Sequence, residues 1–198
     1  SAEKPAAASA QELEEIVVTG SRIMRASALE GTIPVTSVAA TELVQQGDIN
    51  IGDALNDLPS LRSTYSQGNS TRFIGTAGLN FLDLRGLGVE RTLVLVNGRR
   101  HITASPGDYL VDTNTIPSEL IERVDVVTGG NSSVYGSDAV AGVVNFVIDR
   151  KFTGIKLNVV GGITDRGDNQ NYQLTGSFGT SFADGKGRDV KFRLITFE

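Results

Sequence analysis

The sequence predicts an α+β fold, in which a glycine-rich domain of short strands and short helices precedes longer antiparallel strands. Two valine-rich runs, 123–128 and 143–148, enclose a segment interrupted by Gly129, Gly130, Gly136 and Gly142. Glycine at this spacing is typical of turns and close backbone packing, not of long helices. After Lys151 apolar and polar residues alternate instead, which indicates strands with two different faces.

Length and composition favour one domain with an extension. The chain has 198 residues, of which 39% are hydrophobic, and a formal net charge of -5. This acidic balance argues against nucleic acid as a partner, because such a surface needs a concentrated basic face. The sequence contains no cysteine, so disulfides, zinc–thiolate sites and cysteine nucleophiles are excluded. Its apolar runs are also far shorter than the ~20 residues of a membrane-spanning helix.

The N-terminal residues divide into a polar tail and a β-branched segment. Residues 1–13 are mostly alanine, serine and charged residues, so we expect a disordered tail. In residues 14–20, two glutamates precede Ile16, Val17 and Val18, which favour an extended strand. Two interpretations stay open: this segment adds to the sheet edge of another protein, or it forms an edge strand of the domain's own sheet.

The next elements are a strand and two short helices. Residues 33–38 predict a strand, and residues 41–46 a helix that ends at glycine. A second helix is predicted over 51–58, because Asn50 is a good N-cap and Pro59 stops the helix. Its apolar residues share one face, so we expect this helix to lie on a sheet.

The polar stretch 61–77 is a candidate ligand-facing loop. It carries many hydroxyl and amide side chains together with the rings of Tyr65 and Phe73. Loops of this length in a compact domain are often functional. The other interpretation is a solvated linker.

Residues 81–85 and 92–96 predict two strands separated by the sequence GLGVER. A dinucleotide site is rejected here, because the third glycine is missing and a strand follows where a helix is required. Asn97-Gly98 predicts a tight hairpin turn into a strand over 99–103. A short helix opened by Pro117 then leads into the strand at 123–128.

After Lys151, three segments alternate between apolar and polar residues, around 155–159, 172–178 and 190–194. Their lengths approach the ~9–11 residues of a bilayer-crossing strand. Three strands cannot close a barrel, for which about eight are needed, so residues 151–198 are interpreted as the first strands of a truncated transmembrane β-barrel. Their free edges are expected to pair with each other, with the preceding domain, or with a neighbouring chain in a strand-mediated oligomer.

No catalytic, metal or cofactor site is predicted. His101 is the only histidine and stands beside two arginines, which favours a surface or packing role. Ser132 and Ser133 do not lie in a nucleophile motif. Asp165, Asp168 and Asn169 fit a hairpin turn better than a calcium loop. The sequence therefore does not predict an enzyme.

Four blocks in order carry a resemblance to a known family. They are EEIVVTGSRI at 14–23, NIGDALNDLPSL at 50–61, LDLRGLGVERTLVLVNGRR at 82–100 and IERVDVVTGGNSSVYGSDAVAGVVNFVID at 121–149. Together they resemble the N-terminal plug of a TonB-dependent outer-membrane receptor. The resemblance covers roughly residues 14–149, and four ordered blocks are far more specific than one.

The resemblance implies a plug domain at 30–150, with a small mixed β-sheet and short helices, seated inside a barrel of about 22 strands in the bacterial outer membrane. The segment 14–23 resembles the TonB box, which would pair with the C-terminal domain of TonB from the periplasm. The residues that would bind TonB are Glu15, Ile16, Val17, Val18 and Thr19.

The resemblance also implies a function and two further sets of residues. The plug would gate energy-coupled uptake of a scarce nutrient, namely a ferric siderophore, cobalamin or an oligosaccharide. Contacts between plug and barrel would involve Arg85, Arg91, Glu122 and Arg123. Ligand-facing loops would present Tyr65, Gln67, Asn69, Arg72, Phe73 and Tyr109. The alternative is a barrel-less periplasmic module for interaction or signalling.

Overall fold

The computed structural model describes residues 34–44, 50–66, 68–72, 75–149, 152–163, 170–183 and 189–196. Several sequence predictions therefore lie outside the described residues. These are the N-terminal tail 1–13, the TonB-box-like segment 14–23 with Glu15, Ile16, Val17, Val18 and Thr19, the loop residues Gln67 and Phe73, and the turn at 164–169.

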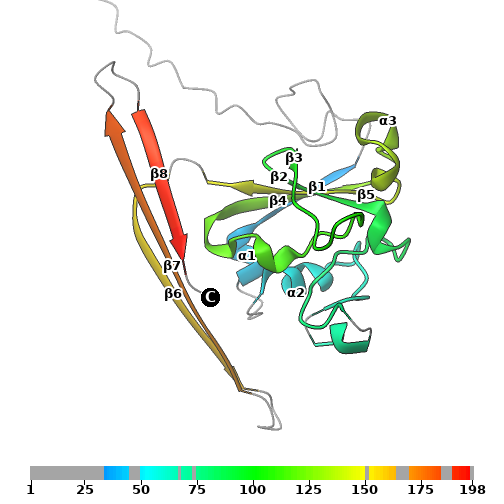
Figure 1. The fold of residues 1–198 in the computed structure, drawn as a ribbon, viewed down its shortest axis with the longest axis horizontal. Helices are drawn as coiled ribbons and strands as arrows, with labels where there is room; N and C mark the ends of the chain where they lie inside the picture. Colours follow the sequence, from blue (N-terminus) through cyan, green and yellow to red (C-terminus); the bar gives the residue numbers. More distant parts are fainter. Residues whose placement is uncertain are drawn as a thin grey trace, which may run out of the picture.

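A five-stranded mixed sheet forms the centre of the first domain (Figure 1). The strands are β1 (Val35–Ala39), β2 (Thr92–Val96), β3 (Arg99–Arg100), β4 (Ile121–Thr128) and β5 (Gly142–Ile148), in the spatial order β1-β4-β5-β2-β3. β5 pairs in parallel with β2, while the other pairings are antiparallel. The predicted small mixed sheet is confirmed.

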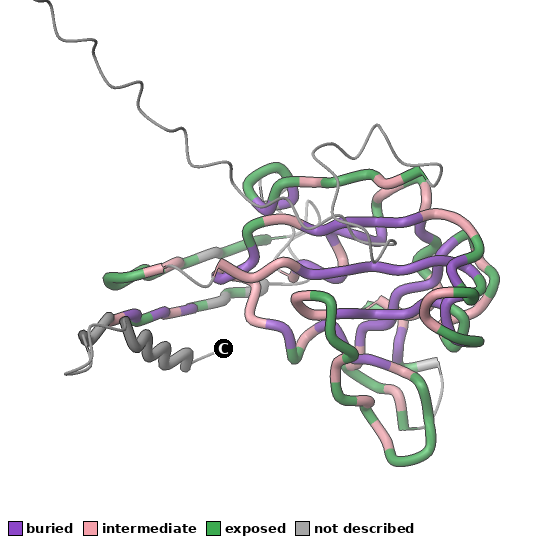
Figure 2. The backbone as a smooth tube through the Cα atoms, turned by 90° about the horizontal axis from the view of Figure 1, so that it is seen from above, coloured by how far each residue is buried: buried purple, intermediate pink, exposed green. Residues whose placement is uncertain are grey.

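Two short helices cover one face of this sheet, α1 (Ala40–Val44) and α2 (Ile51–Asn56) (Figure 1). The Asn50 side chain caps α2 as predicted, accepting a hydrogen bond from the amide of Gly52 at 2.8 Å. The helices and this sheet face share the main core, which includes Leu43, Leu55, Val124, Val126 and Phe146. Figure 2 shows the buried residues concentrated along the central strands.

A smaller apolar cluster lies on the opposite sheet face. It contains Leu93, Leu95, Val127, Ala139 and Val143, with Tyr135 packed against it. The segment between β4 and β5 supplies this end of the domain through α3 (Ser132–Tyr135) and the 3₁₀ helix η6 (Ser137–Ala139). Tyr135 therefore closes one end of this cluster.

The strand predicted at 81–85 is not formed. Instead of a continuous ladder, this segment forms two isolated bridges with the chain before it, Leu61 with Leu84 and Tyr65 with Phe81. Asp83 is the physical reason, because its carboxylate accepts hydrogen bonds from Thr64 Oγ1 at 2.7 Å and from the Gly88 amide at 2.8 Å. These side-chain bonds replace a regular ladder with a turn-rich loop.

The hairpin at Asn97-Gly98 is confirmed, although its second strand is shorter than predicted. Both turn residues have positive φ, 51° for Asn97 and 73° for Gly98, as a two-residue hairpin turn requires. β3 ends at Arg100 because the following loop closes on itself, with the Ala104 amide bonded to the Leu110 carbonyl at 2.7 Å.

The other short elements are the 3₁₀ helices η2 (Ser70–Arg72), η3 (Val89–Arg91), η4 (Thr113–Thr115) and η5 (Ser118–Leu120).

A second, antiparallel sheet stands beside this domain (Figure 1). It consists of β6 (Gly154–Ile163), β7 (Gln170–Ala183) and β8 (Asp189–Thr196), in that order. Of the three pairings left open by the sequence, the structure shows the strands paired with each other. No helix in the described part of the chain is both long and apolar enough to cross a membrane.

Candidate functional site

Two polar loops, 61–80 and 101–116, are joined at their bases by Asn80. This residue is completely buried. Its backbone amide donates to Asp112 Oδ1 at 3.0 Å, and its carbonyl accepts from the Thr113 amide at 2.9 Å. The two loops therefore have a common, fixed base.

The same asparagine connects both loops to α2. Asn80 Nδ2 donates to Asp53 Oδ1 at 2.7 Å, and Asn56 Nδ2 donates to Asn80 Oδ1 at 3.3 Å. Gly52 makes this approach possible, because a Cβ there would lie 2.4 Å from Thr113 Oγ1 and 2.6 Å from Asn80 Cγ. A buried network of this kind holds its elements in one arrangement when its groups are paired.

The tips of the two loops differ in what they offer. Tyr65 packs edge-on against Phe81, with ring centroids 5.6 Å apart. Asn69 accepts a hydrogen bond from the Ser66 amide at 2.7 Å. Tyr109, by contrast, is 64% exposed and Ile102 is 77% exposed. Of these side chains, Tyr109 and Ile102 are the ones most exposed to solvent.

A cavity of about 340 Å³ lies beneath Tyr109, lined by residues that include Thr92, Val94, His101 and Asp108. On its wall, Arg100 Nη2 bonds Asp138 Oδ1 at 3.0 Å, and a second contact joins the same guanidinium and carboxylate. The hydrogen bond from Arg100 lowers the pKa of Asp138, and the bond to Asp138 raises the pKa of Arg100. The pair therefore stays ionised and connects the hairpin to η6.

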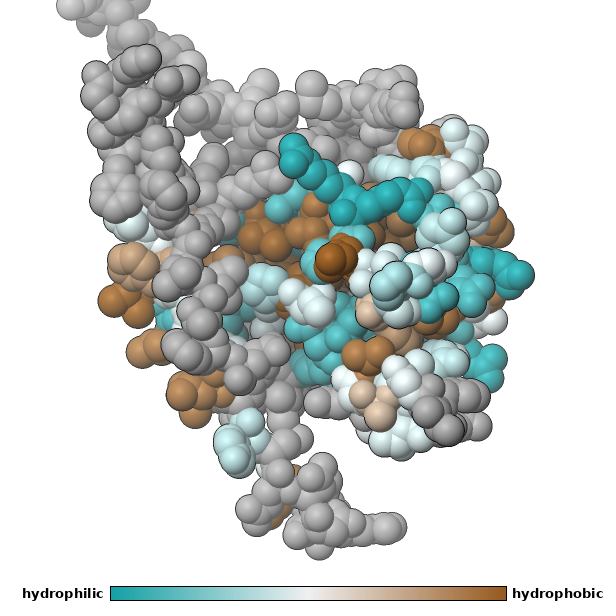
Figure 3. All heavy atoms as spheres, viewed as in Figure 1, coloured by the Kyte–Doolittle hydropathy of each residue, from teal (hydrophilic) through white to brown (hydrophobic). Residues whose placement is uncertain are grey.

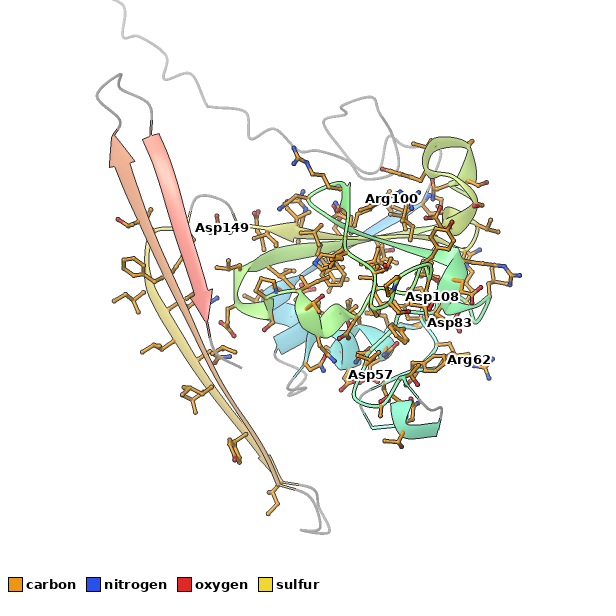
Figure 4. The ribbon with its side chains drawn as sticks, in the orientation of Figure 1. Asp57, Arg62, Asp83, Arg100, Asp108 and Asp149 are labelled. Atoms are coloured by element: carbon orange, nitrogen blue, oxygen red, sulfur yellow. The ribbon has the colours of Figure 1, made fainter. Side chains whose placement is uncertain are left out.

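Three arginines gather around the loop between Leu84 and Thr92. Arg85 and Arg91 are exposed, and Arg91 Nη1 donates to the Leu87 carbonyl at 2.7 Å. Arg62 reaches the same loop from the preceding segment, since a Cβ on Gly86 would lie 3.0 Å from Arg62 Cδ. Within the described ranges, none of the three forms a salt bridge with a carboxylate. Figure 4 shows Arg62 on the side of the domain away from β6–β8.

The first two strands of the second sheet have one apolar and one polar face. The outward side chains are exposed and apolar (Figures 3 and 4): Ile155, Leu157, Val159, Ile163, Tyr172, Leu174 and Phe178. The alternate positions include two polar pairs that lie in register, Lys156 opposite Ser177 and Asn158 opposite Thr175. Thr175 and Ser177 are buried. Polar side chains thus face the first domain, and apolar ones face away from it.

One residue of η5 joins the first domain to this polar face. Asn158 Nδ2 donates to Glu119 Oε1 at 2.8 Å. Lys156 Nζ lies 3.6 Å from Glu119 Oε2 and donates to the Glu119 carbonyl oxygen at 3.1 Å. The Glu119 side chain is only 11% exposed. The two sheets therefore meet through a carboxylate.

Comparison with known proteins identifies the family. The family model "TonB-dependent Receptor Plug Domain" matches residues 27–143. The chain belongs to the TonB-dependent receptor plug family. It is also 33% identical over 138 residues to the vitamin B12 transporter BtuB of Vibrio cholerae, a match that covers 70% of this chain and 21% of the relative. The chain thus spans about a fifth of the length of that relative.

Solved structures share the fold of this plug. The ferric enterobactin receptor PfeA of Pseudomonas aeruginosa matches with a TM-score of 0.57 and 19% identity, over 77% of this chain and 23% of that one. The siderophore receptor PirA of Acinetobacter baumannii matches with a TM-score of 0.53 and 24% identity, over 73% of this chain and 22% of that one. These names describe a transporter and receptors, and none describes an enzyme.

The four residues predicted to contact the barrel are divided between two places on the plug. Arg85 and Arg91 both lie on the loop between Leu84 and Thr92, whereas Glu122 and Arg123 lie on β4 and pair with each other at 3.5 Å. Arg123 Nε also lies 3.3 Å from the buried carboxylate of Asp125, which accepts a second bond from Ser37. Arg123 is therefore engaged inside the plug.

Sequence reasoning missed Arg62 and Glu119. Arg62 approaches Gly86 because the chain folds back between them, and no local pattern announces such a contact. Glu119 stands directly before Leu120 and Ile121, which are buried. A charged residue at the start of a buried apolar segment is the one signal that could have pointed to it. The described residues contain no group of three or more His, Cys, Asp or Glu side chains placed to hold a metal ion.

Proposed function

We propose that this chain is the plug and the first wall strands of an outer-membrane receptor that takes up a scarce nutrient with energy supplied through TonB. The observation that carries the proposal is the two-faced character of β6 and β7. Their outward residues are apolar, whereas their inward face includes Lys156, Asn158, Thr175 and Ser177, of which Asn158 contacts the plug. Apolar-out, polar-in alternation is the pattern of a strand between lipid and a polar interior.

The proposed arrangement divides the chain into a TonB-box-like segment at 14–23, a plug at 30–150 and wall strands at 151–198. In a bacterial outer membrane, the plug would lie inside the barrel with its N-terminus toward the periplasm. The three arginines support this seating, because Arg62, Arg85 and Arg91 present charge without a carboxylate partner among the described residues. Carboxylates of the barrel wall are their proposed partners, since such pairs can fix one orientation.

The proposed cargo is a ferric siderophore, cobalamin or an oligosaccharide. The relative from Vibrio cholerae is named for vitamin B12, and a structural neighbour for ferric enterobactin. Tyr65, Asn69, Arg72 and Tyr109 remain the proposed ligand-facing residues, together with Gln67 and Phe73. The exposed ring of Tyr109 above its cavity gives this assignment its best support.

The proposed TonB contact is the segment Glu15 to Thr19, which would add as a strand to the sheet of TonB's C-terminal domain. We test it with Val17→Pro, which removes a ladder donor, and with Val17→Thr, which keeps both the donor and the β-branch. The proline variant should lose binding to that domain in a titration, and the threonine variant should keep it. Equal binding by both variants would contradict strand addition.

A barrel-less periplasmic module is less well supported. It would leave the outward apolar residues of β6 and β7 in water, where a contiguous patch of this kind favours association. Pairing through the outer edges of β6 or β8 with a neighbouring chain stays a second proposal, which light scattering of the chain in detergent tests directly. A strictly monomeric particle would contradict it.

A further inference from the structure

The plug meets the first wall strands along a seam that contains few direct polar contacts. On the strand side, Lys156, Asn158, Thr175 and Ser177 face the plug. A cavity of about 690 Å³ lies along the same seam, lined by residues of α1, η5 and β6. Close apolar packing therefore does not hold this part of the seam together.

Two hydroxyl groups in the seam are buried without compensation. Thr175 Oγ1 and Ser177 Oγ have no hydrogen-bond partner among the residues that the structure describes. Burial of an unpaired hydroxyl costs free energy, so these groups weaken the contact instead of stabilising it. The attraction between plug and strands must come from other groups.

Glu119 supplies that attraction with both carboxylate oxygens and its carbonyl. Oε1 accepts from Asn158 at 2.8 Å, Oε2 lies 3.6 Å from Lys156 Nζ, and the carbonyl accepts from the same ammonium at 3.1 Å. Charge-assisted hydrogen bonds of this kind are stronger than neutral ones and depend on geometry. One side chain thus contacts two residues of β6.

The backbone of η5 presents Glu119 from a fixed position. Leu120 and Ile121, which follow it, are buried. The Leu120 carbonyl accepts a hydrogen bond from the Asp149 amide at 2.8 Å, which attaches η5 to the end of β5. Figure 4 shows Asp149 on the side of the plug that faces the strands.

We infer that Glu119 is the positioning residue that seats the plug against the inner face of β6 and β7. The inference rests on the proposed plug-and-wall arrangement and names the residue that maintains it. Arg85 and Arg91 lie at a different part of the plug and do not contribute to this seam. Loss of the Glu119 carboxylate should therefore loosen the plug against these strands without disturbing its own core.

The chain contains no native cysteine, so two engineered cysteines report this seating without interference. Ser133→Cys on α3 and Tyr172→Cys on β7 are both at exposed positions. Spin labels at these sites give the distribution of plug-to-strand distances for the whole chain in detergent. Glu119→Ala should replace the narrow distance distribution by a broad one. Glu119→Gln should give an intermediate width, because glutamine keeps an oxygen that accepts from Asn158 but loses the negative charge that attracts Lys156.

The matched control is Glu90→Ala, which removes an exposed carboxylate on η3, away from this seam. It should leave the distribution narrow. A strand-side variant, Lys156→Met with Asn158→Leu, should broaden the distribution as Glu119→Ala does while the plug sequence is unchanged. Protection of β4 and β5 amides from hydrogen exchange verifies that the plug remains folded.

A narrow distribution in Glu119→Ala, or equal broadening in Glu90→Ala, would overturn the inference. If Glu119→Ala also loses protection of its β4 and β5 amides, its plug is no longer folded. The distance distribution of the strand-side variant then tests the inference, and a narrow distribution in that variant would overturn it. The measurement requires neither TonB nor a nutrient, so a negative result would leave the proposed uptake function untouched. Failure of TonB binding would, conversely, leave the seating result unchanged.

Discussion

Arg100, at the end of the β2–β3 hairpin, hydrogen-bonds the carboxylate of Asp138 in η6, with 3.0 Å between Nη2 and Oδ1. The pair joins two segments that are 38 residues apart in the sequence. Asp138 is largely buried, with 10% of its side chain exposed, whereas the Arg100 side chain is 51% exposed. The contact therefore holds the hairpin against the apolar cluster around Ala139 while remaining open to solvent on one side.

This pair predicts a pH-dependent contribution to stability. The pKa of Asp138 is lowered in the folded state, so the contribution is present above the unfolded pKa of about 3.9 and is lost as pH falls through the folded pKa. Asp138→Asn should cost about 1 kcal/mol of unfolding free energy at pH 7, since the arginine is half exposed. Urea midpoints of wild type and variant should converge below about pH 4. Glu90→Gln, at an exposed position, is the control, and a gap that persists at low pH would contradict the linkage.

At Gly52, substitution by alanine should change stability in the direction opposite to that expected from helix propensity. Alanine in a helix normally stabilises by about 1 kcal/mol relative to glycine. At Gly52 the new Cβ would lie 2.4 Å from Thr113 Oγ1, so Gly52→Ala should instead destabilise by about 2 kcal/mol or more. Gly130→Ala is the control, because nothing lies within 4 Å of a Cβ there. Equal denaturation midpoints for the two variants would show that the Asn80 network tolerates displacement.

Two substitutions at Asn97 should distinguish the cost of backbone strain from the cost of a lost side-chain hydrogen bond. Its Oδ1 accepts from the Ile148 amide at 3.0 Å, and its φ is 51°. Asn97→Gly keeps the left-handed backbone and loses the side-chain bond, at a cost of about 1 kcal/mol. Asn97→Ala loses both and should cost about 2 kcal/mol. Thermal unfolding of both variants should rank alanine below glycine, and the reverse order would refute the assigned turn geometry.

The outward face of the second sheet predicts sensitivity to charge. Val159 and Leu174 are register partners on that face, 74% and 57% exposed. Lysine at either position should lower insertion into phosphatidylcholine vesicles by up to ~2–4 kcal/mol, depending on depth in the bilayer. Thr115→Lys, at an exposed plug position, should insert like the wild type. Vesicle flotation measures the partition, and unchanged flotation of Val159→Lys would mean that this face does not meet lipid.

Local signals explain which elements were predictable from the sequence. The N-cap at Asn50, the turn at Asn97-Gly98 and the valine-rich runs of β4 and β5 each depend on neighbouring residues, and each is confirmed. The end of α2 at Asn56 and the short β3 differ from prediction because element ends depend on tertiary contacts.

Contacts between distant segments explain the remainder. No periodicity shows that β5 inserts between β4 and β2, or that the carboxylate of Asp83 replaces a strand ladder with a loop. Arg62 over Gly86 and Glu119 against β6 are also pairings across the fold. The predicted TonB contact lies outside the described residues and stays a prediction, as do the roles of the ligand-facing residues.

Only five residues separate Ile148, the last residue of β5, from Gly154, the first of β6. A fully extended chain advances ~3.3–3.6 Å per residue, so this connection spans no more than about 20 Å. Glu119 lies on the same flank, because η5 is bonded to Asp149 at the end of β5. A force that displaces the plug therefore rotates it about this flank. The opposite flank, which carries Arg62, then undergoes the largest displacement.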